Sequence, residues 1–205
     1  MEIAYYLPGV TSHDNLIAST RLISKKEWVF TREFRHPACT ITIRPFCITR
    51  DLAVIGHWET RLQRAGQLVA ASYLYTGDSD FARSFMVLVN ERTPVCQVDI
   101  SEAGKDELSE CYQARPGDHI VRFLFNTEKN TIRLLHVKAL QACIAYFFSF
   151  PEIKQLVADT DLTEPLHQEL VQKAGFRFRG KVHHNYRVAH LYSFSRHGFH
   201  QSLFE

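Results

Sequence analysis

The segment 153-IKQLVADTDLTEPLHQELVQKAGF-176 decides the fold that this sequence predicts. It opens with Ile153 to Ala158, a short run rich in branched residues after Pro151 that is typical of a strand. Asp159 and Asp161 stand at the carboxyl end of this run, where open α/β sheets usually bind their ligands. A ligand-binding α/β unit is therefore expected in the last third of the chain.

A helix is expected directly after this strand. Asp161 and Glu164 have the spacing of a capping box, and Pro165 is tolerated in the first turn of a helix. Gly175 is expected to end the helix. Four apolar residues fall on one helical face: Leu166, Leu170, Val171 and Ala174.

Strands and helices are expected along the rest of the chain as well. Besides 153–158, the predicted strands are 39–46, 84–89, 95–100, 120–125, 176–182 and 186–194. One or two helices are predicted within 50–75, and a long, mostly apolar helix over 132–149. The predicted connections are a turn at 76–80, a hairpin at 90–94, a loop with a short helix at 101–115 and a turn at 183–185. Strands that first form a meander and later alternate with helices predict an α/β (α+β) fold, a mixed sheet flanked by helices.

Several short motifs resemble the GNAT acyl-CoA-dependent N-acyltransferases. In the carboxyl half they are 157-VADTD-161, 170-LVQKAGF-176 and 187-RVAHLY-192. Upstream they are 43-IRPF-46, Asp51-Leu52, His57-Trp58 and 117-GDH-119. The sequence is most similar to the branch that acylates lysine or hydroxylysine side chains in siderophore assembly, such as the aerobactin and mycobactin acyltransferases. The resemblance implies a mostly antiparallel central sheet, acetyl-CoA or another acyl-CoA as co-substrate, and a small-molecule amine or hydroxylamine as acceptor.

Composition limits the other classes of function. The chain has 205 residues, of which 45% are hydrophobic, enough for one sizeable core. We expect an N-terminal extension at 1–40 packed on the domain, a GNAT-like domain at 41–196 and a tail at 197–205. A net charge of +2 gives no footprint for nucleic acid, and no long apolar run predicts a membrane span or an export signal. Five scattered cysteines without a CxxC pair predict reduced thiols and hence a cytoplasmic protein. A monomer or a homodimer is expected.

The start of the helix at 132–149 is the expected cofactor site. It carries basic side chains although the positive end of the helix dipole favours acidic ones, so a bound anion would resolve the conflict. The resemblance places the cofactor pyrophosphate here, on a turn at 126–131 that in this chain holds no glycine. It implies these cofactor-binding residues: Leu124, Phe125, Asn126, Thr131, Arg133, Leu134, His136 and Lys138. The alternative is that the basic side chains are ordinary solvated groups.

The candidate catalytic residues are His119, Asp159 and Asp161. Transfer from a thioester to an amine needs a base for the amine proton and a donor for the oxyanion, commonly a main-chain N–H freed where the central strand splays. In the siderophore branch an acidic residue and a histidine on adjacent strands form the expected pair, and in this chain Arg122 could occupy the position of that histidine. The alternatives are that Asp161 caps the helix and that His119 is a strand-edge histidine.

Two further groups carry both a functional and a structural interpretation. His57 and Trp58 could contact the acceptor, as the resemblance implies, or anchor their helix to the sheet. His183, His184 and His190 lack further ligands at zinc-binding spacing, so no metal site is predicted and a solvated hairpin is favoured.

The sequence thus predicts an acyl-CoA-dependent N-acyltransferase for a small amine or hydroxylamine, in siderophore biosynthesis. The alternative is a degenerate member of the same fold that binds a ligand or a partner without catalysis. An unrelated small α/β binding protein would instead show a different strand order.

Overall fold

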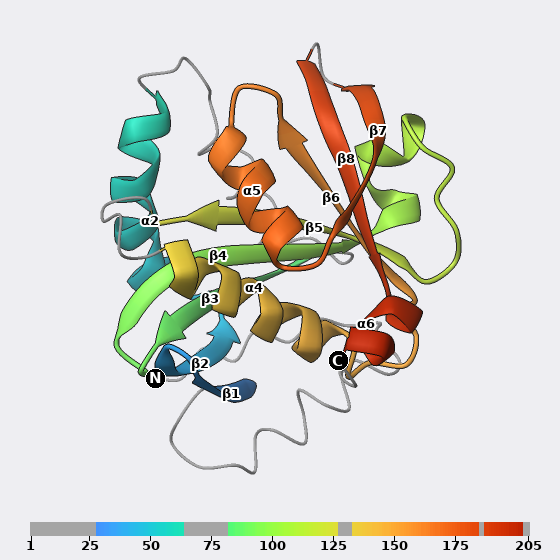
Figure 1. Ribbon diagram of the computed structural model, residues 1–205. Coiled ribbons are helices and arrows are strands. Elements are labelled where there is room, and N and C mark those ends of the chain that lie inside the picture. The colour runs from blue at the N-terminus through green and yellow to red at the C-terminus, as the bar shows by residue number, and fades with distance from the viewer. Residues whose placement is uncertain (1–27, 64–81, 127–132, 185–186, 203–205) are drawn as a thin grey trace.

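The computed structural model describes residues 28–63, 82–126, 133–184 and 187–202. They form a mixed eight-stranded sheet in the order β1-β2-β3-β4-β5-β6-β8-β7, in which only the β5–β6 pair is parallel (Figure 1). The strands are β1 Phe30–Arg35, β2 Ala38–Pro45, β3 Ala82–Val89, β4 Thr93–Glu102, β5 Asp118–Phe125, β6 Gln155–Asp161, β7 Arg177–His184 and β8 Arg187–Ser195. The helices are α2 Ile48–Gln63, α4 Arg133–Phe147, α5 Pro165–Lys173 and α6 Arg196–Ser202, with short 3-10 turns at η1 Ala103–Lys105 and η2 Glu107–Glu110. The mixed, mostly antiparallel sheet flanked by helices confirms the predicted fold class.

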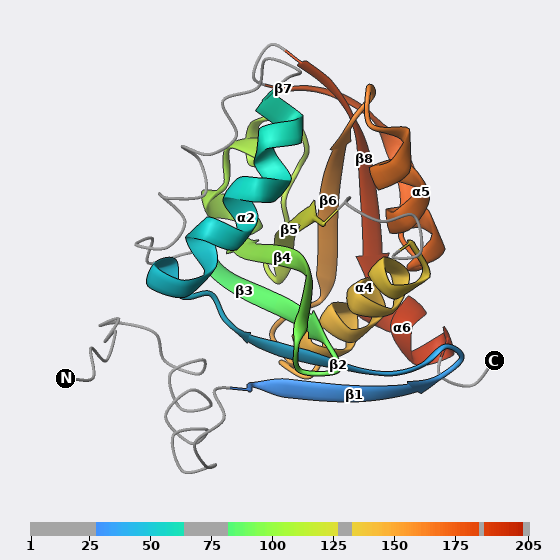
Figure 2. The same ribbon diagram turned by 90° about the vertical axis from the view of Figure 1, so that its left-hand side faces the viewer.

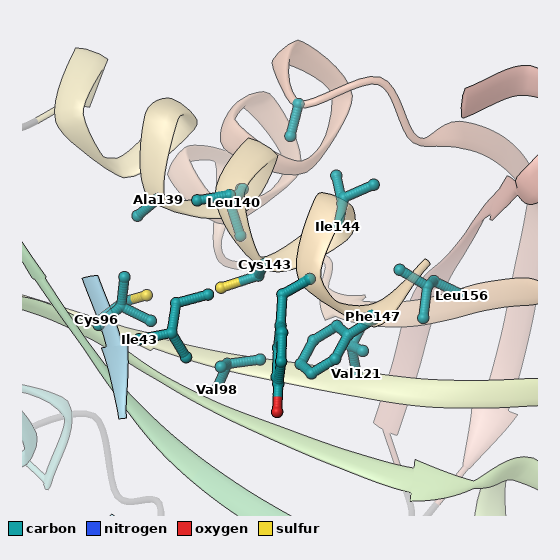
Figure 3. Close-up of a cluster of buried hydrophobic side chains, with 14 of the residues drawn as sticks. Ile43, Cys96, Val98, Val121, Ala139, Leu140, Cys143, Ile144, Phe147 and Leu156 are labelled. Atoms are coloured by element: carbon teal, nitrogen blue, oxygen red, sulfur yellow. The ribbon is translucent and has the colours of Figure 1, made fainter. Parts of the chain in front are cut away.

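Helices cover both faces of the sheet. Figure 2 shows α2 on one side and α4, α5 and α6 on the other. The apolar helix α4 contributes the largest part of the core, because the side chains on its inner face point at the sheet (Figure 3). Those labelled in the figure are Ala139, Leu140, Cys143, Ile144 and Phe147, above Ile43, Cys96, Val98, Val121 and Leu156. Each large apolar side chain buried in this way contributes about 1.5–3 kcal/mol.

The α2 face of the sheet is divided into two apolar clusters. Ile55 and Trp58 of α2 pack with Met86, Leu88 and Leu124. A second cluster joins η1 and η2 to four strands, β5, β6, β7 and β8, through these residues: Ala103, Leu108, Ile120, Val157, Val182, Ala189 and Leu191. Polar residues of β3, β4, β5 and β6 lie between the two clusters, and they form part of the site described below.

One prediction made for the segment 153–176 is wrong. Helix α5 begins at Pro165 with Glu164 as its N-cap residue, so the predicted capping box of Asp161 and Glu164 is wrong. The Asp161 carboxylate instead accepts hydrogen bonds from the N–H and the hydroxyl of Thr163, at 2.8 and 2.7 Å. Asp side chains often form such local turns, and the turn delays the start of the helix.

The carboxyl end of α5 agrees with the prediction. Gly175 ends the helix with a φ of +111°, a conformation that L side chains rarely adopt. A Cβ at this position would also lie 3.2 Å from the ring of Phe194. Both facts account for a glycine here.

For three other predictions, the boundaries differ from those of the structure or lie outside the described residues. Strand β1 lies within the predicted N-terminal extension and pairs with β2, which itself spans the predicted boundary at residue 40. Strand β7 runs through His184, so the predicted turn at 183–185 is shorter than expected, and residues 185–186 lie outside the described residues. The predicted helix beyond residue 63 and the turn at 76–80 also lie outside them. None of the helices within the described ranges is long and apolar enough to cross a membrane.

Arg196 joins the end of β8 to the loop between α4 and β6. Its guanidinium donates to the carbonyl oxygens of Ile153 at 2.8 Å, of Phe148 at 2.6 Å and of Phe150. It also lies over the Phe148 ring, with its Cζ 5.3 Å from the ring centroid. The side chain therefore satisfies carbonyls just beyond the carboxyl end of α4, where a cation is favoured by the helix dipole.

We expect Arg196→Met to lower the free energy of unfolding by about 3 kcal/mol, because hydrogen bonds from a charged donor contribute about 1.5–3 kcal/mol each and are not additive. Urea unfolding followed by circular dichroism measures the change. Lys105→Met is the control, since Lys105 pairs only with the exposed Glu102 carboxylate in the described part of the chain. Equal stability of the Arg196 variant and the wild type would contradict a structural role for the guanidinium.

Candidate active site

The two parallel strands at the centre of the sheet diverge. Pairing between β5 and β6 starts at Asp118 and Gln155 and ends at Ile120 and Val157, although β5 continues to Phe125. Figure 1 shows the carboxyl ends of β5 and β6 pointing apart, with α5 on one face of the sheet beside them. We call this feature the strand divergence. It is a splay of the central strand of the kind expected from the sequence.

Main-chain N–H groups of β5 point to the side of the divergence. The Asn126 N–H donates to the Val95 oxygen at 2.9 Å, and the pairing of β4 with β5 continues from there without a register shift. Because donors alternate along an antiparallel strand, every second residue from Asn126 directs its N–H to β4. The N–H groups of Phe123 and Phe125 therefore point to the β6 side, beyond the last β5–β6 pair.

A row of polar side chains crosses the α2 face at the divergence. Ser84 on β3 is paired with Asp99 on β4, and Asp99 is paired with Arg122 on β5. Asp159 on β6 completes this polar row, with its Oδ1 3.9 Å from Nε of Arg122. The row therefore places a carboxylate on each side of the Arg122 guanidinium, Asp99 on β4 and Asp159 on β6.

Asp106 holds Arg122 in place. Its two carboxylate oxygens accept from the guanidinium at 2.6 and 2.8 Å, and they also accept from the Ser101 hydroxyl at 2.9 Å and the Leu108 N–H at 3.0 Å. Burial by itself would raise the pKa of Asp106, but the hydrogen bonds and the charge of Arg122 outweigh it and hold the pKa below its usual range. Arg122 is therefore oriented by a bidentate pair of fixed geometry.

The two acidic candidates of β6 differ in their surroundings. Asp159 lies beside Arg122 at the divergence, and its side chain is buried. Asp161 uses one carboxylate oxygen to bind Thr163, so a structural role accounts for part of its side chain. Asp159 is the better placed of the two for chemistry.

Asp99 is a buried carboxyl group in this row. Burial raises its pKa to about 6, although hydrogen bonds from Ser84 and Gln97 and the charge of Arg122 oppose the shift. Gln97 donates to Asp99 at 3.1 Å through its amide nitrogen, while its amide oxygen is buried without a hydrogen-bond partner among the described residues. A carboxyl group with a raised pKa beside a specific charge is a frequent mark of a functional site.

We expect Asp99→Asn to stabilise the protein at pH 8 by roughly 2–3 kcal/mol, since one pKa unit corresponds to about 1.4 kcal/mol. The folded state binds the Asp99 proton more tightly than the unfolded chain, so this group's contribution to stability is complete below pH ~4 and lost as pH rises through ~6. The gain should therefore disappear at low pH. Urea unfolding of both proteins at pH 8 and pH 4.5 measures it, and a loss of stability at pH 8 would contradict the raised pKa.

The structure does not bring His119 together with the acidic candidates. His119 pairs with Leu156 at the start of the β5–β6 ladder, before the strands diverge. Side chains alternate between the faces of a strand, so His119 shares the α4 face with Val121, whereas Arg122 and Asp159 lie on the α2 face. Burial lowers the pKa of His119, and its Nδ1 lies 3.3 Å from the Gly117 oxygen. The expectation of a shared cleft is thus wrong, and Arg122 occupies the position beside Asp159.

The α4 face of the divergence carries aromatic and imidazole rings. The ring of Phe125 lies 5.0 Å from that of His136 on α4 and 5.0 Å from that of His167 on α5. Burial lowers the pKa of His136 to about 4, so this imidazole is neutral at physiological pH. The main-chain groups of Asn126 and Val95 lie close enough to the His136 ring to oppose this shift, but neither ring nitrogen has a hydrogen bond of good geometry among the described residues. The buried hydroxyl of Thr160, which lies on the α4 face of β6, also has none among them.

The His136 ring nitrogens and the Thr160 hydroxyl are polar groups that could pair with the cofactor that the sequence predicts. An acyl-CoA carries an arm with amide groups, and those groups would pair with buried donors and acceptors that otherwise cost free energy. His136 and Thr160 would face that arm, and the N–H groups of Phe123 and Phe125 would face the acyl carbonyl. The residues on this face therefore fit the cofactor.

The remaining predicted cofactor residues are spread over different surroundings. Leu124 lies on the opposite face, packed in the α2 cluster, and Asn126 donates through its side chain to the Pro94 oxygen at 3.3 Å. Arg133 and Leu134 are exposed at the start of α4, and Arg133 lies 3.9 Å from Glu169. Thr131 and the turn that was expected to hold the pyrophosphate lie outside the described residues.

Lys138 is directed to another part of the fold. Its ammonium lies 3.3 Å from the Gln141 side chain and 5.0 Å from the ring centroid of Phe34 on β1. It helps to fasten the edge strand β1 to α4, since a cation over an aromatic face is worth about 0.5–1 kcal/mol. A direct contact of Lys138 with the cofactor is therefore not what this geometry favours.

The structure describes only one of the two predicted acceptor side chains on α2. Trp58 is buried against Met86, Leu88 and Leu124, which agrees with its structural interpretation. His57 lies in α2, but its side chain is outside the described residues. The histidines at 183 and 190 lie in β7 and β8, and no group of metal-binding side chains occurs within the described ranges.

Sequence reasoning missed Asp99, Asp106 and His167. Asp106 lies in a polar loop without periodic pattern, and only the fold brings it to Arg122. Asp99 interrupts an otherwise apolar strand, 95-VCQVDI-100, and a charged residue in such a run is a signal that could have been noticed.

Comparisons with known proteins agree with this geometry. A family model described as the acetyltransferase (GNAT) domain matches residues 49–184. An uncharacterized protein from Bacillus halodurans has a similar structure, with a TM-score of 0.74 and 15% identity over 84% of this chain and 92% of its own. The aminoglycoside acetyltransferase AAC(6')-Ib in complex with coenzyme A and kanamycin gives 0.65 and 20% over 80% and 99%. A chimera of the spermidine N-acetyltransferase SpeG from Vibrio cholerae gives 0.55 and 14% over 78% and 97%. A search of curated proteins found no match.

Proposed function

The chain belongs to the GNAT acetyltransferase family, and from this premise we propose that it transfers an acetyl group from acetyl-CoA, or an acyl group from another acyl-CoA, to the amine or hydroxylamine of a small molecule. Solved structures of similar fold bind coenzyme A and a multiply aminated acceptor, kanamycin, which supports this class of substrate. The finer proposal is an acceptor of the siderophore type, a hydroxylated lysine or diamine.

The strand divergence is the observation that carries the proposal. A thioester that enters it from the α4 face meets the N–H groups of Phe123 and Phe125. Such main-chain donors stabilise the oxyanion that forms when an amine attacks the carbonyl carbon. The acceptor would approach from the α2 face, where Arg122 and Asp159 lie.

Asp159 is proposed to bind the acceptor nitrogen and to take up its proton. A carboxylate accepts hydrogen bonds only, which suits the N–H groups of a free amine or hydroxylamine. Arg122, held by Asp106, fixes the carboxylate from the other side. The amine then attacks the thioester carbonyl directly, so the enzyme needs no nucleophile of its own.

The test is an assay of CoA release with acetyl-CoA and a panel of acceptors: hydroxylysine, lysine, N-hydroxycadaverine, cadaverine, spermidine and kanamycin. The proposal predicts thiol release above the blank for at least one amine, with the N-acetyl product identified by mass spectrometry. A preference for the hydroxylated acceptors would support the siderophore assignment, and a preference for spermidine or kanamycin would overturn it. Release at the blank rate for the whole panel would favour the non-catalytic module.

A further inference from the structure

His167 is a titratable group that the proposed steps do not yet use. It lies in α5, and its ring packs edge-on against Phe125 at 5.0 Å, with an interplanar angle of 68°. Phe125 is one of the two residues whose N–H groups point to the strand divergence. His167 is thus placed on the cofactor side of the divergence, next to the strand that would bind the acyl carbonyl.

A carboxylate orients the His167 ring. Nδ1 lies 2.8 Å from Oε2 of Glu164, one helical turn earlier, and the two side chains are 18% and 25% exposed. The Nδ1–H donates to this carboxylate, which leaves Nε2 as the nitrogen that can serve a reaction. A carboxylate behind an imidazole fixes the orientation of the ring, as in other pairs of a base and an orienting group.

The reaction leaves one proton without an assigned source. When the tetrahedral intermediate collapses, the bond from carbon to sulfur breaks and its electron pair goes to sulfur. A thiol of ordinary acidity has a pKa of about 8.5, so the departing thiolate takes up a proton readily at neutral pH. Asp159 is on the other face of the sheet and has received the amine proton, so a separate donor is needed on the cofactor side.

We propose that His167, oriented by Glu164, donates from Nε2 the proton that the departing CoA thiolate takes up. This inference rests on the proposed acyl transfer. The acceptor reacts as the free amine, whose nitrogen loses one proton to Asp159 on attack. The sulfur gains one proton from His167, and both groups re-equilibrate with water after the products leave. The products are the amide and the free thiol, so atoms and charge balance.

His136 of α4 and Glu164 of α5 are ionisable groups close to His167. His136 is neutral at physiological pH because burial lowers its pKa to about 4. It therefore does not compete as an acid, and Glu164 is the carboxylate that pairs with the His167 ring. The imidazole-rich face of the divergence thus contains one group suited to donate a proton.

His167→Asn is the informative variant. The Asn amide nitrogen takes the place of Nδ1 and keeps the hydrogen bond to Glu164, but nothing takes the place of Nε2. We expect kcat with acetyl-CoA to fall about a hundredfold, within the usual range for general acid catalysis. The exposed His183→Asn on β7 is the matched control and should retain the wild-type rate.

A second acyl donor separates acid catalysis from a structural role. The acetyl thioester of 4-nitrothiophenol has a leaving group that needs no proton, so the wild type and His167→Asn should use it at rates within about threefold of each other.

Some results would overturn the role of His167, and a different result would overturn the proposed function. An equal loss of rate for both donors would overturn the proposal in favour of a packing role. An unchanged kcat with acetyl-CoA would overturn it as well. Failure of the proposed function would look different, because the wild type itself would then transfer acetyl groups from acetyl-CoA to no amine.

Discussion

Asp159→Asn is expected to reduce kcat/KM for acyl transfer about a thousandfold, the loss of a general base and of a charged contact to the acceptor together. Asn keeps the size of the side chain and can still accept a hydrogen bond, but it takes up no proton. Asp159 lies 3.9 Å from Arg122, so the variant also leaves this guanidinium with Asp106 as its main partner. Steady-state kinetics with acetyl-CoA and the best acceptor of the panel measure the effect.

The control for this variant is Glu102→Gln, which removes an exposed carboxylate at the end of β4 that pairs with Lys105. It should keep the wild-type rate. Urea unfolding of Asp159→Asn shows whether the fold is kept. A folded Asp159→Asn protein with nearly wild-type kcat/KM would remove Asp159 from the mechanism and return Asp161 as the acidic candidate.

Asp51→Ala is expected to be the most destabilising of the substitutions considered, with a loss of about 3–5 kcal/mol. Arg44 and Asp51 form a buried bidentate pair at 2.6 and 2.7 Å, and the Cys47 N–H donates to the same carboxylate at 2.8 Å. The pair connects β2 to the first turn of α2. Removal of Asp51 leaves a buried guanidinium without its carboxylate, which costs a large part of the 5–15 kcal/mol typical of a folded domain.

A second variant shows that the cost comes from the unpaired charge. Arg44→Met with Asp51→Leu replaces both partners by apolar groups of similar size, and such replacements are often neutral. The double variant should therefore be more stable than Asp51→Ala alone. Equal losses in the two proteins would show that packing, and not the orphaned charge, accounts for the effect.

The same pair gives a stability that depends on pH. Burial would raise the pKa of Asp51, but the Arg44 hydrogen bonds, the Cys47 N–H and the neighbouring charges hold it below its usual range. A lowered folded-state pKa contributes stability above the ordinary carboxyl pKa that is lost as pH falls through the folded value. The difference in stability between wild type and Asp51→Ala should thus shrink in acid.

The sequence could predict those elements whose pattern is local. The apolar run at 132–149 predicts a helix, and α4 spans Arg133–Phe147. The hairpin between β3 and β4 has positive φ angles at Asn90 and Glu91, in agreement with the short connection predicted there. The end of α5 at Gly175 follows from one residue and its conformation.

The errors concern contacts that depend on register. His119 and Asp159 are on adjacent strands, but only the register shows that they lie on opposite faces of the sheet. The partner of Arg122 comes from a loop 16 residues earlier, where no periodicity indicates it. The start of α5 was missed because the Asp161 side chain binds Thr163 rather than the helix. Strand register and the choice between competing hydrogen bonds decide these contacts, and the composition of the sequence predicts neither.

A calorimetric titration with acetyl-CoA, with CoA alone as the comparison, tests the central claim most directly. If the strand divergence receives the cofactor arm, both ligands bind with micromolar dissociation constants, equivalent to about −8 kcal/mol. An absence of binding heat for either ligand, at protein concentrations far above the micromolar range, would contradict the assignment of this site to acyl transfer.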